Sequence, residues 1–188
     1  MSIMNNLQKE NEIDGFISQY PVCQYAVLDA AEVPFSEKVR HICKTECGRY
    51  GKSWSCPPGV GEVAQCRERC LKYDRVLVFT TLAEVSDASI LSETLATRAG
   101  HEEITRALVK ELKARGAVCL PLSSESCQIC ERCAYPEACR HPDYAIPCIE
   151  SYGILVTEIA EKCGIDFLYD AHTVTWFGLI FFSYENQC

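Results

Sequence analysis

A run of four closely spaced cysteines constrains this chain more than any other part of its sequence. Two residues separate Cys127 from Cys130 and Cys130 from Cys133, and five more precede Cys139. Each two-residue step is one tight turn, so the sulfurs of a C-x2-C-x2-C run reach the same side and can surround one compact inorganic cluster. Cys139 can supply the fourth thiolate. The spacing therefore predicts a [4Fe–4S] cluster in a loop over residues 126–142.

A structural zinc site is the alternative for this loop. Zinc sites commonly combine two C-x2-C pairs separated by a longer loop, so that four sulfurs reach a tetrahedron from two directions. Three cysteines in consecutive turns suit a larger cubane instead, because its irons are spread apart. The segment therefore favours iron–sulfur chemistry, and zinc stays open as the other cofactor.

The number of cysteines and the charge of the chain limit its compartment and partners. Fourteen cysteines among 188 residues require either disulfides or metal. The N-terminal residues are polar and acidic, unlike a secretory signal, and no stretch of about 18 apolar residues occurs. We therefore expect a reducing cytoplasm, where clustered cysteines are more often ligands than disulfides. The net charge of −8 argues against nucleic acid or an anionic membrane as a partner.

Hydrophobic periodicity predicts a single domain over residues 1–188, of α/β or α+β class, with a sheet of about four strands covered by helices. Strands are expected at residues 22–29, 75–85, 117–122 and 174–183. Helices are expected at residues 4–18, 37–43, 59–73 and 148–162, and in a long run after Asp87 that bends at Gly100. The last strand is apolar enough to be central, and the third leads directly into the cysteine run. The run is therefore expected at an edge of the sheet.

A second cysteine-rich segment, CKTECGRYGKSWSCPP, lies at residues 43–58. Three residues separate Cys43 from Cys47, and eight separate Cys47 from Cys56. Glycines and prolines mark the segment as a loop. Two cysteine-rich loops in one chain indicate either two metal centres or one centre built from both.

These segments resemble an uncharacterised family of predicted metal-binding proteins, domain of unknown function 2284. The resemblance rests on YGKSWSCPP at residues 50–58, SCQICERCAYPEACRHP at 126–142, IPCIESYGI at 146–154 and VTWFGL at 174–179. It implies a cytosolic protein with cysteine-ligated metal of the iron–sulfur kind, and it supplies no settled reaction. The ligands that it implies are Cys43, Cys47 and Cys56 in the first loop and Cys127, Cys130, Cys133 and Cys139 in the second. The other cysteines fall outside the family pattern.

The first loop departs from that pattern, because three residues rather than four separate its first two cysteines, and it has no evident fourth ligand. An iron without a protein thiolate is a Lewis acid that can bind the oxygen, nitrogen or sulfur of a substrate. Alternatively, Cys66 or Cys70, four residues apart on one helix face, completes the site. A further alternative makes both of these thiols core residues, since free cysteine buries well.

Four basic residues near the cysteines are candidates for contact with a cluster or an anionic ligand. Arg49 and Lys52 in the first loop can offset the charge of thiolates or hold an anion, and exposed surface charge explains them equally well. Arg140 and His141 directly follow Cys139 and can hydrogen-bond to cluster sulfur.

Three functions remain open. The preferred one is a cytosolic iron–sulfur protein that passes electrons to a redox partner protein through one or two [4Fe–4S] clusters. The second is an enzyme acting on a small-molecule substrate at an open iron of the first cluster, with Arg49, Lys52 or Tyr50 holding the substrate. The third is a zinc-stabilised or metal-delivery protein. The sequence does not indicate an oligomeric state.

Overall fold

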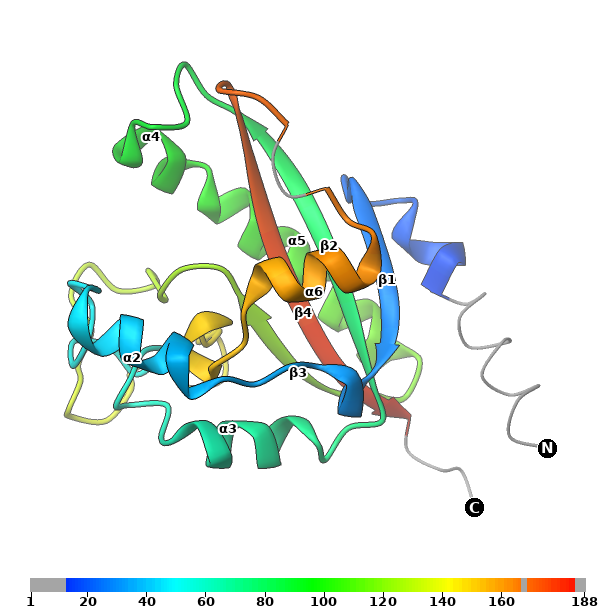
Figure 1. The fold of residues 1–188 in the computed structure, drawn as a ribbon. Coiled ribbons are helices and arrows are strands. Elements are labelled where there is room, and N and C mark those ends of the chain that lie inside the picture. The colour runs from blue at the N-terminus through cyan, green and yellow to red at the C-terminus, as the bar shows by residue number, and fades with distance from the viewer. Residues whose placement is uncertain (1–12, 167–168, 185–188) are drawn as a thin grey trace.

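The computed structural model describes residues 13–166 and 169–184, which are built around one antiparallel sheet. Its strands are β1 (Gln24–Asp29), β2 (Arg75–Glu84), β3 (Ala117–Ser123) and β4 (Thr173–Tyr184), in the order β1-β2-β4-β3 (Figure 1). All four predicted strands are confirmed, with ends that differ by at most two residues. Every pairing is antiparallel, so the α+β alternative is the correct class.

The helices cover both faces of the sheet. They are η1 (Ala30–Glu32), α2 (Glu37–Thr45), α3 (Val63–Cys70), α4 (Leu91–Ala96), α5 (Arg98–Ala114), η2 (Glu150–Tyr152) and α6 (Val156–Cys163). Residues 13–17 are also helical, and the earlier part of the helix predicted at 4–18 lies outside the described residues. In the described ranges, no helix has both the length and the apolar character that crossing a membrane requires.

Two of the predicted helices are interrupted. The run after Asp87 breaks at Thr97 and not at Gly100, which lies inside α5. The Thr97 hydroxyl donates to the Thr94 carbonyl at 2.8 Å and accepts from the Trp176 indole N–H at 2.8 Å, so β4 holds the break in place.

The helix predicted at 148–162 is divided into η2 and α6 by Gly153. Gly153 has φ 80°, in the left-handed region that glycine adopts without strain. A Cβ atom there would lie 2.8 Å from a methyl group of Val63, so no larger residue fits this turn.

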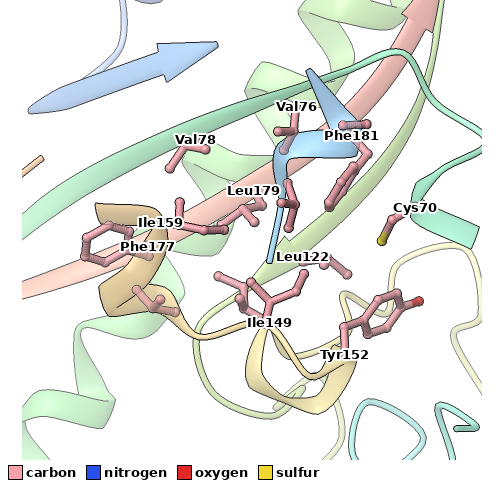
Figure 2. Close-up of a cluster of buried hydrophobic side chains, with 14 of the residues drawn as sticks. Cys70, Val76, Val78, Leu122, Ile149, Tyr152, Ile159, Phe177, Leu179 and Phe181 are labelled. Atoms are coloured by element: carbon pink, nitrogen blue, oxygen red, sulfur yellow. The ribbon is translucent and has the colours of Figure 1, made fainter. Parts of the chain in front are cut away.

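Successive side chains of β2 point to opposite faces of the sheet, and the core is accordingly divided into two layers. Val76 and Val78 face α3, η2 and α6, whereas Leu77 and Phe79 face α5 and the helical turn at residues 13–17. Figure 2 shows the first layer, in which residues of β2, β3 and β4 pack against Ile149, Tyr152 and Ile159. Because both layers press on β4, its long apolar run is buried on both faces, as predicted for a central strand.

His101 on α5 is buried at the second layer. Its Nδ1 lies 2.8 Å from the Thr81 hydroxyl oxygen, and its Nε2 lies 3.1 Å from the Phe177 carbonyl oxygen. A neutral ring satisfies both contacts, with Nε2–H donating to the carbonyl. Burial lowers the pKa of His101 to about 4.

This depressed pKa predicts an acid-dependent loss of stability. As the pH falls below about 6.5, the unfolded chain protonates its histidine first, so the stabilisation present above pH 6.5 is lost progressively toward pH 4. We expect the free energy of unfolding to fall by about 2–3 kcal/mol from this group alone. Urea unfolding of wild type and His101→Gln at pH 7 and pH 4.5 measures it. Equal acid sensitivity of the two proteins would contradict the assignment.

Candidate metal centres

The two cysteine loops lie side by side at one end of the sheet, next to α2 (Figure 1). The backbone N–H of Cys127 donates to the Ser55 hydroxyl at 2.8 Å. The Trp54 indole N–H donates to the Glu137 carbonyl at 2.7 Å, and its ring meets Tyr135 edge-on at 5.0 Å. β3 is an edge strand, which confirms the predicted place of the second loop. Segments far apart in the sequence therefore build one unit.

The second loop surrounds a small cavity. All four of its predicted ligands line it, namely Cys127, Cys130, Cys133 and Cys139. Ser53, Trp54 and Ser55 of the first loop complete the wall. The volume of about 20 Å³ is little more than a single water molecule needs. The segment 124–147, which carries these four cysteines, contains no helix or strand.

Hydrogen bonds at the Cys133 sulfur favour its thiolate form. Burial acts to raise the pKa of this thiol, but backbone N–H groups of Tyr135 and Trp54 and the Ser53 hydroxyl outweigh it, so the pKa is lowered. Two of these donors come from the first loop. Hydrogen bonds to thiolate sulfur are among the features that tune iron–sulfur clusters.

The donor set at the small cavity fits an iron–sulfur cluster. Four thiols surround it, and hydrogen-bond donors reach one of their sulfurs. Among the described residues, no three His, Cys, Asp or Glu side chains form a group that could hold a metal ion. The thiolates of a [4Fe–4S] cluster each bind a different iron, so they do not have to converge on one point.

The three predicted ligands of the first loop line a second, larger cavity of about 520 Å³. Cys43 comes from the last turns of α2, Cys47 follows that helix, and Cys56 is buried farther along the loop. Burial raises the pKa of Cys56 to about 11, and negative charge on Cys47 and Cys43 adds to the effect. The three thiols therefore share the wall of one cavity.

Cys148, which was assigned no site from the sequence, lines the same large cavity. Its thiol donates to the Glu150 carboxylate at 2.9 Å, and Glu150 also lines the cavity. Burial raises the pKa of Glu150. Cys148 lies within the segment 146–154 that resembles the family, but it was not one of the ligands that the resemblance implied. No spacing rule joins a lone cysteine to a loop so far away in the sequence.

Cys66 and Cys70 are core residues. Both are fully buried on α3 and pack in the layer shown in Figure 2, with Val76 and Tyr152. Within the part of the chain that the structure describes, neither is among the residues lining the two cysteine cavities. Their role as a fourth ligand therefore has no support from the fold.

The two basic residues of the first loop differ in their position relative to the large cavity. Arg49 lines the large cavity and forms an ion pair with Glu125 at 3.8 Å, and Tyr50 lines the same cavity. Lys52 is exposed, and its Nζ donates to the Gly48 carbonyl at 2.5 Å. Lys52 is not one of the residues lining that cavity.

The two basic residues of the second loop both line the small cavity. The guanidinium of Arg140 donates to the Arg132 carbonyl, so it braces its own loop. His141 is exposed at the same wall. Their positions are compatible with the predicted contact to a cluster.

The chain matches a known protein family over most of its length. The model of the family described as predicted metal-binding protein (DUF2284) matches residues 26–182. This range includes both cysteine loops and every thiol that lines the two cavities. No curated protein and no solved structure matches the chain significantly. Because the match covers most of its length, the chain belongs to the DUF2284 family of predicted metal-binding proteins.

Proposed function

We propose that this protein carries electrons through two iron–sulfur centres, one at each thiol-lined cavity. The proposal rests above all on residues 53–57, which separate the two cavities. Ser53, Trp54 and Ser55 line the small one, and Cys56 and Pro57 line the large one. Ser126 and Cys127 of the second loop likewise line the large and the small cavity, so two redox centres held there would be neighbours between which an electron can pass.

In this proposal, the second loop holds a [4Fe–4S] cluster, which supplies one-electron transfer when bound. The ligands are Cys127, Cys130, Cys133 and Cys139. The chain itself orients the thiolates and directs N–H groups at sulfur, as at Cys133. Family membership supports metal binding, and the choice of iron–sulfur over zinc rests on the cysteine spacing and these donors.

Electron transfer also requires a redox partner protein, which we place in the cytoplasm with this chain. The small cavity lies close to the surface, since Ile129 lines it and is 37% exposed. A partner docked there would approach the second centre directly.

A second candidate is an enzyme that acts on a small molecule at the first centre. The large cavity, about 520 Å³, falls in the range of about 300–1,000 Å³ that small-molecule sites occupy. Arg49 and Tyr50 line it and can contact a substrate, while Lys52 is not among its lining residues. This candidate needs a coordination position at the first centre that no thiolate fills.

Metal analysis after anaerobic purification tests the proposal. Two [4Fe–4S] clusters predict about eight iron and eight acid-labile sulfide per chain, with little zinc. About four iron and four sulfide per chain would restrict the proposal to one centre. Zinc without sulfide would contradict the iron–sulfur proposal. Adding cyanide to the reduced protein then separates the two candidates. A changed electron paramagnetic resonance signal would favour an open iron and the enzyme, whereas unchanged signals favour the carrier.

A further inference from the structure

We propose that Cys148 is the fourth thiolate of the first metal centre, an inference that rests on the proposed presence of metal at the large cavity. Its partners are Cys43, Cys47 and Cys56, and all four line that cavity. The sequence left this position open.

Backbone contacts place Cys148 directly beside Cys56. The N–H of Cys148 donates to the carbonyl of Ser55 at 3.1 Å. Cys148 also forms an isolated parallel bridge with Ser123, the last residue of β3. The position of this thiol is therefore set by the sheet edge on one side and by the first loop on the other.

A buried arginine ties Cys148 to the helix that carries Cys43. Arg40 lies three residues before Cys43 on α2, and its guanidinium donates to the Ser151 carbonyl at 2.5 Å. The Ser151 hydroxyl in turn donates to the Cys148 carbonyl at 2.6 Å. This chain of contacts holds two thiols from distant segments on the same cavity. Such preorganisation is what a metal centre built from separate segments requires.

Glu150 is the competing ligand, because its carboxylate accepts from the Cys148 thiol at 2.9 Å and lines the same cavity. Thiolates, rather than carboxylates, hold iron–sulfur clusters in most proteins. We therefore assign Glu150 to the surroundings of the centre. If Cys148 is the ligand, its substitution should affect the metal, and if Glu150 is the ligand, the substitution of Glu150 should do so. Substituting each residue in turn therefore distinguishes the two assignments.

The experiment compares wild type, Cys148→Ala, Glu150→Gln and Cys163→Ala, each purified without oxygen. Cys163 is a partly buried thiol packed against the core and serves as the matched control. Iron and sulfide are measured per chain, and electron paramagnetic resonance spectra are recorded with and without cyanide. We expect Cys148→Ala to lose about half of its iron and sulfide, or to keep them and gain a signal that cyanide shifts. Cys163→Ala should match wild type in content and spectra, and Glu150→Gln should keep the wild-type iron and sulfide content.

Wild-type content and spectra in Cys148→Ala would overturn the assignment, as would loss of metal in Glu150→Gln alone. If Cys148→Ala does not fold, as judged by circular dichroism, the nearly isosteric Cys148→Ser takes its place with the same criteria. If wild type holds zinc instead of iron and sulfide, the iron–sulfur proposal fails. A loss of zinc in Cys148→Ala would then still identify Cys148 as a ligand, and an unchanged zinc content would overturn that assignment. A wild type that binds neither metal overturns both proposals.

Discussion

Replacing Cys130 with serine is expected to remove the cluster at the small cavity and with it about half of the iron and sulfide of a two-cluster protein. Cys130 is the middle cysteine of the run and lines that cavity. A cluster that loses one of four thiolates has an iron held by a poorer ligand or by none, and the irregular loop offers no spare thiol nearby. Iron and sulfide analysis, with electron paramagnetic resonance of the reduced protein, measures the loss.

Cys163→Ser is the control for this substitution. Cys163 ends α6, packs against the core and is not among the residues that line either cysteine cavity. Its metal content should equal that of wild type. Equal losses in the two variants would show that the ligands are assigned to the wrong cysteines, and no loss in Cys130→Ser would remove the second loop as a metal site.

Gly178→Ala is expected to cause a large loss of stability for a change of one methyl group. Gly178 lies on the central strand β4, opposite Phe79 of β2. A Cβ atom at position 178 would lie 2.2 Å from Cζ of the Phe79 ring, which is fully buried. Overpacking of a closely packed core costs about 1–3 kcal/mol, and we expect the upper part of that range. Urea denaturation of the holo-protein measures the change.

Gly100→Ala is the matched control for this prediction. Gly100 lies inside α5, and nothing lies within 4 Å of a Cβ atom built there. Alanine in a helix is about 0.5–1 kcal/mol more favourable than glycine, so this variant should be slightly more stable than wild type. Combining Gly178→Ala with Phe79→Leu should recover part of the lost stability, because the smaller side chain vacates the contact. A stable Gly178→Ala single variant would contradict the packing described for β4.

Local patterns were sufficient for most of the secondary structure. The strands were predicted because continuous or alternating apolar residues define them independently of their neighbours, and β4 is the clearest case. The start of the helix predicted at 37–43 is also local, because the hydroxyl of Ser36, a residue typical of helix N-caps, accepts from the N–H of Lys38. One helix break was placed at the wrong residue and the other was not predicted, because both depend on distant partners. Trp176 anchors Thr97 at one break, and Val63 packs on Gly153 at the other.

The sequence by itself determined that four thiols gather in the second loop, because four cysteines within 13 residues (127–139) lie in one loop whatever the rest of the chain does. It also determined that the loop leaves the sheet edge, since a strand runs directly into it. Only the tertiary structure decided which thiols line the large cavity. Antiparallel pairing of β3 with β4 and the Arg40 contact bring Cys148 to Cys43 and Cys56, whereas α3 turns Cys66 and Cys70 into the core. Long-range packing has no signature in residue spacing, and it alone selects which thiols share a cavity.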